Sequence, residues 1–322
     1  MKILDKKREL KKTIKTSSNV FITGHLDLDL DALGSIIGVN YIVNRLKKKS
    51  LIILDDKKHE KGVNKVLLQI KDKYNFITSN KINDIIDEKS LLIIVDTNKE
   101  KLISKNILGK FKNIIIIDHH DLTKESINNA LLIVDDSTSS TCEMITELII
   151  NYNILLNSDI ATLLLSGIVL DTSNFVIKTN ALTYYCAAFL TNMGASPKKV
   201  QYLLKQDIKK YIERQKVITE VKIINKKIAL TAGSNKEIYR REDLAKIADT
   251  LLLFEEIEGS FVIGKLDKKA IGISARSMGK VDVGKILKKF NGGGDTNNAA
   301  ARIEESTISK VKQDLIKIIK NI

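Results

Sequence analysis

The chain is poor in the residues that mark disulfide scaffolds, zinc knuckles and membrane spans. Its 322 residues include two cysteines, one proline and no tryptophan, and no CxxC motif occurs. A disulfide framework or a zinc knuckle is therefore not expected. No apolar run approaches the roughly 20 residues that a membrane span needs, and the polar N-terminus lacks the apolar stretch of a signal peptide. We expect a cytoplasmic protein that does not contact the membrane.

Length and charge set only broad limits on the fold and the partner. A chain of 322 residues can form two domains, each with its own core. The formal net charge is +14, from 53 Lys and Arg against 39 Asp and Glu, and such a field favours anionic partners such as nucleotides or nucleic acid. The lysines are scattered, however, and a general bias towards Lys, Ile and Asn explains the charge equally well. Basicity alone identifies no partner.

The first part of the chain alternates between short apolar strands and helices, a pattern typical of βαβ units and a parallel sheet. Predicted strands cover residues 19–23, 51–54, 91–95 and 114–117. Predicted helices cover residues 31–47, 158–170, 181–193 and 197–205, with another that follows capping residues 137–140 and runs through residue 150. Cys142 and Cys186 fall in apolar helical patterns, which predicts buried thiols.

The pattern changes near residue 223, where strands alternate with amphipathic helices. Predicted strands cover residues 227–232, 259–266 and 270–275, and predicted helices cover 207–221, 241–254, 283–290 and 307–320. We therefore predict an N-terminal parallel-sheet α/β domain over residues 1–205, a linker helix within 206–225 and a smaller C-terminal α+β domain over 226–322.

Histidine is scarce, and three of the four histidines lie in two short acid-rich clusters. The first cluster contributes His25, Asp29 and Asp31, and the second contributes Asp118, His119 and His120. Each cluster follows an apolar run that predicts a buried strand, so both should emerge at the carboxyl ends of strands, where open α/β sheets bind ligands. Imidazoles combined with carboxylates suit divalent cations, Mn²⁺ or Mg²⁺ in particular.

The residues within each cluster can divide their roles. Asp29 and Asp31 alternate in the predicted extended backbone, so their side chains can face different ions. The alternative is a surface loop whose acids cap the following helix, a role that Asp31 could fill alone. We expect the imidazoles of His119 and His120 to point apart, so that one binds a metal and the other faces the substrate. Asp118 could hydrogen-bond to the imidazole nitrogen that does not face the metal.

Two further aspartates end apolar segments. Asp96 directly follows the strand predicted at 91–95, and a carboxylate there is well placed to bridge two cations; the alternative is a helix cap or a turn. Asp171 closes an apolar helix, where its charge opposes the macrodipole and calls for compensation, for example by a cation. Each position is ambiguous alone, but together they predict a metal-dependent hydrolase.

These motifs, in this order, resemble the DHH phosphoesterases that carry a DHH-associated C-terminal domain, and the resemblance covers nearly the whole chain. It implies one Mn²⁺ held by His25, Asp29 and Asp96, and a second held by Asp31, Asp96, His119 and Asp171. Asp96 would bridge the two cations, for which Mg²⁺ is the alternative. The resemblance also implies that water activated between the cations attacks the phosphodiester. His120 would face the scissile phosphate, so His120 and Asp96 are the predicted catalytic residues.

The C-terminal region contains a second group of candidate residues. Three glycines precede a helix that we predict to begin near Asn297, and consecutive glycines let backbone N–H groups approach an anion, although a flexible turn is the simpler explanation. The resemblance assigns substrate binding to this region, with Arg276 as the phosphate clamp. The substrate-binding candidates, besides His120, are Ser274, Arg276, Gly292, Gly293, Gly294 and Asp295.

The resemblance leaves the substrate open. Residues 136–141, 167–175 and 292–300 look closest to the catalytic part of membrane-anchored cyclic di-AMP phosphodiesterases, which implies hydrolysis of cyclic di-AMP to pApA in a cleft between domains. The sequence has none of that group's membrane or sensor segments, so we expect a stand-alone enzyme. The alternatives are a nanoRNA oligoribonuclease and 3′-phosphoadenosine 5′-phosphate (pAp) phosphatase, an enzyme of the RecJ-type exonuclease branch, or a weakly active nucleotide- or nucleic-acid-binding protein. A homodimer is a further expectation.

Three positions depart from the family pattern. Asp295 stands where the glycine run of the family ends in His, Asp121 where a basic residue is common, and Leu28 where Pro is usual. A carboxylate at a phosphate-binding position repels the substrate unless it is paired or protonated. Alternatively, Asp295 reads a base edge, because a carboxylate accepts well from an exocyclic amine.

Overall fold

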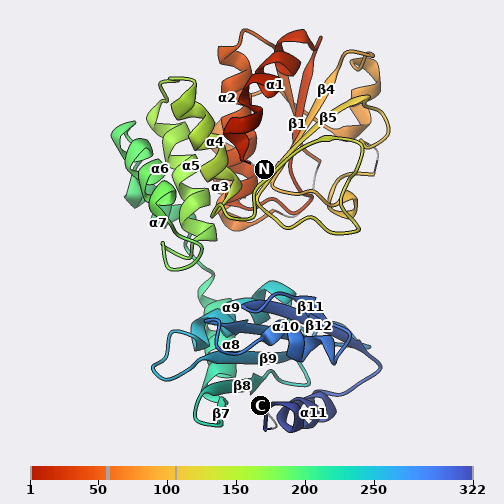
Figure 1. Ribbon diagram of the computed structural model, residues 1–322, viewed down its shortest axis with the longest axis vertical. Helices are drawn as coiled ribbons and strands as arrows, with labels where there is room; N and C mark the ends of the chain where they lie inside the picture. The colour runs from red at the N-terminus through yellow and green to blue at the C-terminus, as the bar shows by residue number, and fades with distance from the viewer. Residues whose placement is uncertain (1, 56–58, 106, 321–322) are drawn as a thin grey trace. The chain divides into compact units, whose positions relative to one another are not determined.

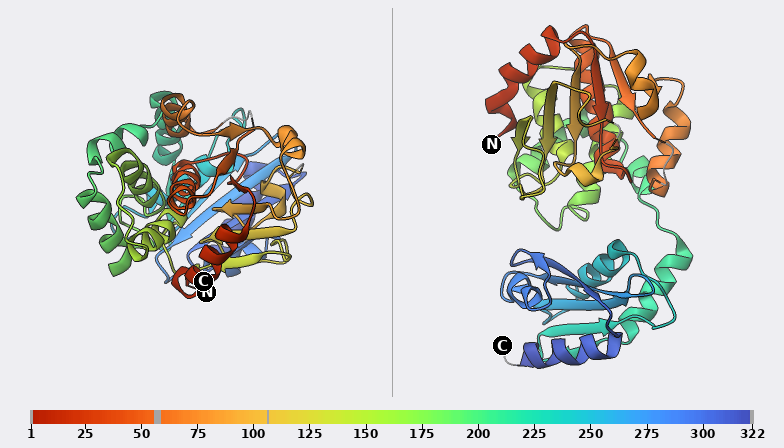
Figure 2. Two further views of the ribbon diagram at one scale, coloured as in Figure 1. Left: turned by 90° about the horizontal axis from the view of Figure 1, so that it is seen from above. Right: turned by 90° about the vertical axis from the view of Figure 1, so that its right-hand side faces the viewer.

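The computed structural model describes residues 2–55, 59–105 and 107–320. The chain forms two compact units, Met1–Lys205 and Gln206–Ile322 (Figures 1 and 2), and each is described by itself. The first unit is an α/β unit built on a six-stranded sheet, and the second contains a second six-stranded sheet with helices. The predicted fold class is confirmed.

The sheet of the first unit is entirely parallel, in the order β3-β2-β1-β4-β5-β6. Its strands are β1 (Val20–Thr23), β2 (Ser50–Ile53), β3 (Phe76–Ile77), β4 (Leu91–Val95), β5 (Asn113–Asp118) and β6 (Leu131–Val134). The chain adds strands on one side of β1 and then on the other, so the order reverses between β1 and β4. In open α/β sheets, this reversal opens a crevice at the carboxyl ends of the strands, and ligands bind there.

The two faces of this sheet are covered differently. One face packs against helices α1 (Ile3–Thr16), α2 (Leu30–Arg45) and α4 (Thr141–Asn151). Helix α5 (Ser158–Asp171) packs on α2 and α4, and α3 (Lys61–Ile70), α6 (Ala181–Asn192) and α7 (Pro197–Leu203) complete this helical layer (Figure 1). The other face is covered by the 3₁₀ helix Ser79–Asp84 and the segment around Ile103 and Phe111. The strands are almost wholly apolar because both faces are buried.

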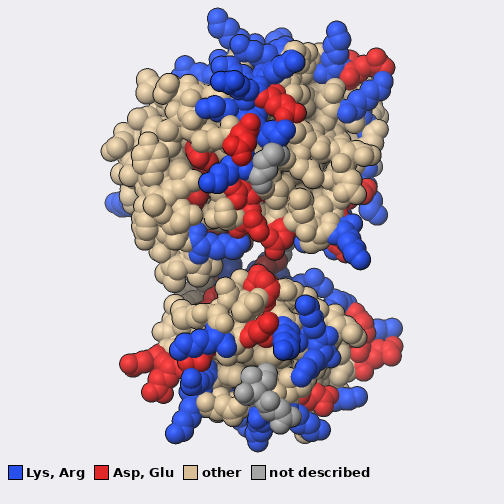
Figure 3. All heavy atoms as spheres, viewed as in Figure 1, with Lys and Arg blue, Asp and Glu red and all other residues tan. Residues whose placement is uncertain are grey.

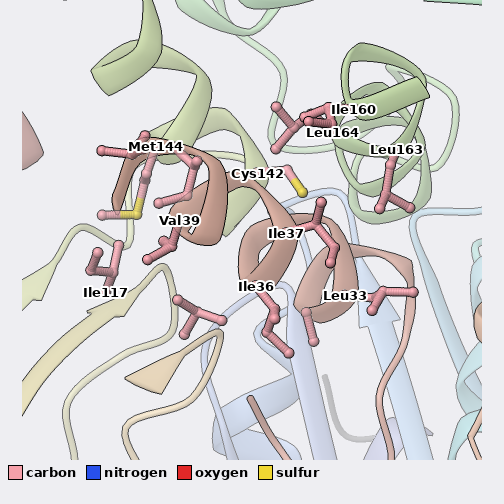
Figure 4. Close-up of a cluster of buried hydrophobic side chains, with 14 of the residues drawn as sticks. Leu33, Ile36, Ile37, Val39, Ile117, Cys142, Met144, Ile160, Leu163 and Leu164 are labelled. Atoms are coloured by element: carbon pink, nitrogen blue, oxygen red, sulfur yellow. The ribbon is translucent and has the colours of Figure 1, made fainter. Parts of the chain in front are cut away.

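Helices α2, α4 and α5 form the main core of the first unit, where aliphatic side chains from all three interdigitate (Figure 4). Cys142 and Cys186 are both buried, as predicted. At Gly167 of α5 the packing is closest: a Cβ atom there would lie 2.5 Å from Cys142 Sγ and 2.7 Å from Asp31 Oδ1. Glycine therefore lets α5 approach the residues at the start of α2 and α4.

The second unit is built on a mixed sheet in the order β11-β12-β10-β9-β8-β7, in which only the β8–β9 pair is parallel. Its strands are β7 (Lys222–Ile224), β8 (Ile228–Ala232), β9 (Gly259–Lys265), β10 (Ala270–Ser277), β11 (Gly293–Gly294) and β12 (Asn298–Glu304). Helices α8 (Ile208–Thr219) and α9 (Arg241–Leu251) cover one face, while α10 (Val283–Lys288) and α11 (Ile308–Lys320) cover the other.

The helix predicted near Asn297 is wrong, because this segment is the second strand of a hairpin. Strand β12 pairs with β10 over seven residues, and β11 pairs with β12 through Gly293 and Gly294. Gly294 has φ 137°, a conformation that favours glycine, and a Cβ there would lie 2.1 Å from the carbonyl oxygen of Asn298. The alanines of β12 favour helix locally, but pairing with β10 decides their conformation.

No bounds were predicted for α1, α3, β3, β6, β7 and β11, which are short or weakly apolar. No helix in the described ranges is both long and apolar enough to cross a membrane. On the face shown in Figure 3, Lys and Arg side chains are spread over both units and interspersed with Asp and Glu. The picture agrees with a scattered rather than a localised positive charge.

The close approach of α5 at Gly167 makes a testable prediction. An alanine inside a helix is normally favoured over glycine by roughly 0.5–1 kcal/mol. At this position we expect Gly167→Ala to lower the free energy of unfolding by about 1–3 kcal/mol, the usual cost of overpacking. Urea unfolding followed by circular dichroism measures the change. An increase in stability would show that the helices can separate without cost.

Candidate metal centre

The structure brings the six predicted metal ligands together at the carboxyl edge of the parallel sheet. In each of three groups of three residues, one potential ligand atom per residue lies within 4.8 Å of the others. The groups are His25, Asp29 and Asp96; Asp31, His119 and Asp171; and Asp96, His119 and His120, in which His120 is the exposed member. His25 and Asp96 follow β1 and β4, the strands between which the order reverses, and His119 follows the neighbouring β5.

Asp96 lies between the first two groups. Its Oδ2 atom is 3.5 Å from Nε2 of His25, and its Oδ1 atom is 3.5 Å from Nε2 of His119. The backbone of Asp96 has φ 60°, a left-handed conformation that is costly for a residue with a side chain and that recurs at active sites. A carboxylate that directs one oxygen towards each histidine has the geometry of a bridging ligand.

Contrary to the prediction from the sequence, Asp29 and Asp31 do not alternate along an extended segment. They lie at the start of helix α2, in different positions. Asp29 is the N-cap of α2, and its Oδ1 accepts the backbone N–H groups of Asp31 and Ala32 at 2.9 Å. Its Oδ2 is 3.8 Å from Nε2 of His25. Asp31 lies in the first turn of the helix. The cap is therefore Asp29, and it keeps one oxygen directed towards the cluster.

Asp31 is held by the N-terminus of α4, a contact that the sequence analysis missed. The backbone N–H groups of Thr141 and Cys142 donate to its two carboxylate oxygens at 2.8 Å each. The Thr141 hydroxyl donates to Asp96 Oδ1 at 3.0 Å. One residue thus orients two candidate ligands. The only signal in the sequence was the capping serine-threonine run before α4, which did not reveal what the helix end would contact.

The cluster is a concentration of buried negative charge. Burial, reinforced by the charge of Asp171, raises the pKa of Asp31 to about 6, and burial with the charge of Asp29 raises that of Asp171 to about 8. Burial and the neighbouring carboxylates raise the pKa of Asp96 well above its usual value. Among the described residues, no lysine or arginine forms an ion pair with these carboxylates. Divalent cations would offset this repulsion.

His119 has the burial and the charge state of a metal ligand. Both ring nitrogens are buried and form no hydrogen bond, although Nε2 lies 3.1 Å from Asp171 Oδ2. Burial lowers the pKa of His119 to about 4, so the imidazole is neutral near pH 7. A neutral imidazole among carboxylates is the donor set that Mn²⁺ accepts. The residues present therefore fit two divalent cations.

His120 and Asp118 lie beside this cluster. The rings of His119 and His120 are 4.2 Å apart at an angle of 55°, so the expectation that they point apart is wrong. His120 Nδ1 lies 2.8 Å from Asp118 Oδ1, and the His120 side chain is 54% exposed while Asp118 is fully buried. Burial lowers the pKa of His120, but the hydrogen bond and charge of Asp118 outweigh it and raise the pKa. An exposed, protonatable imidazole can contact an anionic substrate.

Two cavities lie in different parts of the first unit. His59, which the sequence analysis did not use, lines a small pocket with His25 and Asp55, and its Nδ1 is buried without a hydrogen bond. A larger cavity of about 340 Å³ lies among α2, α3, α5 and α7 and contains none of the six candidate ligands. The site is therefore identified by the chemistry of its side chains and not by the size of a cavity.

The candidate substrate-binding residues of the second unit lie on neighbouring strands. Arg276 at the end of β10 donates from Nε to Asp249 at 2.7 Å and contacts Ser274 Oγ from Nη1 at 3.4 Å. Ser274 pairs with Ala300 of β12, which also pairs with Gly293. Ser274, Arg276 and the glycine hairpin are thus placed along three adjacent strands.

Asp295 stabilises the turn between β11 and β12, a role that could not be inferred from the histidine found at this position in the family. Its Oδ1 accepts the backbone N–H groups of Asn297 and Asn298 at 2.6 and 2.8 Å, which closes the turn between β11 and β12. The residue is exposed. Its carboxylate is therefore partly satisfied by two backbone donors, and a histidine there could not form the same pair of bonds.

Comparisons with known proteins identify the domains of the chain. Residues 19–168 match the model of the DHH family, N-terminal domain, and residues 216–322 match the DHHA1 domain. Cyclic-di-AMP phosphodiesterase PdeA from Listeria monocytogenes is 34% identical over 318 residues, which cover 96% of this chain and 48% of PdeA. The bifunctional oligoribonuclease and PAP phosphatase NrnA from Mycoplasma genitalium is 27% identical over 325 residues and covers 95% of both proteins.

The fold also matches that of a solved structure. An exopolyphosphatase-related protein from Bacteroides fragilis superposes with a TM-score of 0.81 at 19% identity, over 99% of this chain and 97% of that protein. At such low identity the match concerns the fold alone. The chain spans about half the length of PdeA.

The raised pKa values of Asp31 and Asp171 predict that the stabilisation of the fold by metal ions depends on pH. In the metal-free protein, Asp31 and Asp171 keep protons up to pH about 6 and 8, whereas the unfolded chain loses them near 3.8. These two carboxyls therefore make the free energy of unfolding fall as pH rises through this window. Cations bind the deprotonated form, so the increase in Tm on adding Mn²⁺ should be larger at pH 8 than at pH 6.

Thermal unfolding with and without Mn²⁺ at a series of pH values measures this increase. An exposed aspartate outside the cluster, Asp72, provides the control: Asp72→Asn should leave the pH dependence unchanged. An increase in Tm that is the same at every pH would contradict the proposed link between protons and cations.

Proposed function

The chain belongs to the DHH phosphoesterase family, and from this premise we propose that it is a phosphodiesterase that hydrolyses cyclic di-AMP to linear pApA. The proposal includes two bound divalent cations, Mn²⁺ or alternatively Mg²⁺. The observation that carries it is the position of Asp96, with one oxygen directed to His25 and the other to His119. Such a shared carboxylate is what a pair of adjacent cations requires.

The residues of the cluster would divide into two sets of ligands. His25 and Asp29 would hold one cation, Asp31, His119 and Asp171 the other, and Asp96 both. When bound, the cations activate water and neutralise the charge of the phosphate. Thr141 and the N-terminus of α4 keep the carboxylate of Asp31 oriented before any ion binds.

His120 would contact the phosphate rather than a cation. Its ring is half exposed, and Nδ1 is already engaged by Asp118 at 2.8 Å. The raised pKa favours the protonated ring, which can stabilise the negative charge that develops on the phosphate oxygens and donate a proton to the leaving oxygen. In the second unit, we propose that Arg276, Ser274 and the glycines of the β11–β12 hairpin bind the anionic groups of the nucleotide.

The comparisons support two candidate functions to different degrees. Support for cyclic di-AMP comes from the 34% identity with PdeA, which exceeds the 27% identity with NrnA. Support for short RNA and pAp comes from length, because this chain and NrnA cover 95% of each other whereas only about half of PdeA is matched. We therefore keep nanoRNA and pAp hydrolysis as the second candidate function.

Incubation with Mn²⁺ and each substrate separately distinguishes the candidates. We expect cyclic di-AMP to be converted to pApA, detected by liquid chromatography, with slower turnover of pAp and of short RNA. Rapid hydrolysis of pApA or pAp without any product from cyclic di-AMP would favour the second candidate. Tight binding of nucleotide without hydrolysis of any substrate would favour a binding protein.

The bridging role of Asp96 predicts the effect of removing its charge. Asp96→Asn keeps the shape of the side chain but weakens both sets of ligands. Hydrolysis should fall by more than about 100-fold, since even the loss of a group that only orients a ligand costs about 10- to 100-fold. The metal-free protein should keep its fold, because this substitution relieves charge repulsion. Asp72→Asn, at an exposed position, is the matched control. Substantial activity in Asp96→Asn would refute the two-cation assignment.

The turn at Asp295 allows its charge and its hydrogen bonds to be tested separately. Asp295→Asn keeps an oxygen for the N–H groups of Asn297 and Asn298 but removes the charge. If the carboxylate repels the substrate, this variant should lower KM by about 1.5- to 5-fold, the range of an exposed charge interaction. Asp295→His removes the turn bonds as well and should change KM more than Mn²⁺ affinity. Unaltered kinetics in both variants would show that position 295 does not contact substrate.

A further inference from the structure

A buried chain of polar side chains runs from Ser126 to the exposed ring of His120. The Ser126 hydroxyl donates to Asn98 Oδ1 at 2.7 Å, and Asn98 Nδ2 donates to Asp118 Oδ2 at 2.6 Å. The other carboxylate oxygen, Asp118 Oδ1, lies 2.8 Å from Nδ1 of His120. The first three residues are buried, and the chain ends at a group that we propose to contact the substrate.

Asn98 is the central member of this chain. It is 1% exposed, and both ends of its amide are used: Oδ1 accepts from Ser126, and Nδ2 donates to Asp118 and to the carbonyl oxygen of His120 at 3.1 Å. The Ser126 hydroxyl fixes which end of the amide faces the carboxylate. If the amide of Asn98 were turned so that Oδ1 faced Asp118, two acceptor oxygens would lie in contact with no hydrogen between them.

The position of Asp118 determines which nitrogen of His120 carries a hydrogen. Asp118 Oδ1 lies 2.8 Å from Nδ1, whereas the next carboxylate, Asp96 Oδ1, is 3.9 Å away. An ionised carboxylate can only accept, so Nδ1 must be the donor. The same oxygen accepts the backbone N–H of His120 at 3.3 Å, which ties the ring to its own main chain.

We propose that Asn98 and Ser126 are positioning residues, which hold Asp118 against the Nδ1–H of His120 so that Nε2 faces the phosphate and donates to it when the ring is protonated. This inference rests on the proposed function only for the identity of the substrate. Groups that bind the far side of a catalytic imidazole in this way fix its tautomer and orientation. In the described part of the chain, neither the Asn98 nor the Ser126 side chain is hydrogen-bonded to a candidate metal ligand, so their effect passes through Asp118.

The scarcity of histidine makes the tautomer directly measurable. With four histidines, a protein labelled with ¹⁵N in histidine gives four pairs of ring nitrogens by NMR, and the His120→Gln variant assigns the pair of His120. In the metal-free wild type, at a pH where the ring is neutral, we expect hydrogen on Nδ1. Asn98→Asp, which replaces the donor by an acceptor of the same shape, should shift His120 towards a mixture of tautomers. Ser126→Ala should give a smaller shift in the same direction.

Kinetics provide the second measurement. Asn98→Asp should lower kcat by about 10- to 100-fold, the effect seen when groups that orient a histidine at a metal site are lost, while KM and Mn²⁺ affinity change by less. Asn113→Asp is the matched control, because it places the same charge change at the exposed start of β5, whose other end carries Asp118. This control should have the wild-type tautomer and kcat.

The outcomes separate this inference from the proposed function. If no substrate is hydrolysed by the wild type, the proposed function fails, but the tautomer of His120 in Asn98→Asp still decides the inference. A wild-type tautomer in Asn98→Asp overturns it. If Asn98→Asp does not fold, Ser126→Ala decides in its place, and unchanged ring signals with unchanged kcat in that variant overturn the proposal.

Discussion

The mutual repulsion of carboxylates at one edge of the parallel sheet is the constraint on which the rest of the first unit depends. Asp31 and Asp96 are buried, and Asp29 and Asp171 are largely so, without an ion pair to lysine or arginine in the described part of the chain. The fold tolerates them because backbone N–H groups at the starts of α2 and α4 donate to Asp29 and Asp31. Helix N-termini stabilise negative charge, and here two of them converge on one cluster.

This arrangement explains why the cluster lies where it does. The sheet order reverses between β1 and β4, and the ends of these two strands supply His25 and Asp96. Close contact of α2 with α5, made possible by Gly167, brings Asp171 beside the same edge. Sheet topology, helix packing and helix dipoles thus act on the same few side chains, and the raised carboxyl pKa values show that the repulsion is not fully relieved by the protein alone.

Residues that end apolar runs could be identified from the sequence, because a polar residue after a buried strand or helix is visible in the pattern alone. Asp96, His119 and Asp171 are of this kind. The α/β class of the first unit could be predicted as well, because the alternation of strands and helices is visible in the same pattern. Contacts between distant segments could not be identified: Thr141 reaches Asp31 across 110 positions. The failure near Asn297 has the same origin, because pairing of β12 with β10 overrides the local helix preference of its alanines.

The central claim is that Asp96 is shared by two cations, and counting bound ions tests it most directly. Equilibrium dialysis against Mn²⁺ at pH 8, followed by metal analysis, should give two ions per chain at saturation. Asp31 and Asp171, with pKa values of about 6 and 8, are at least half deprotonated at this pH. A saturation value of one ion or none per chain would contradict the account.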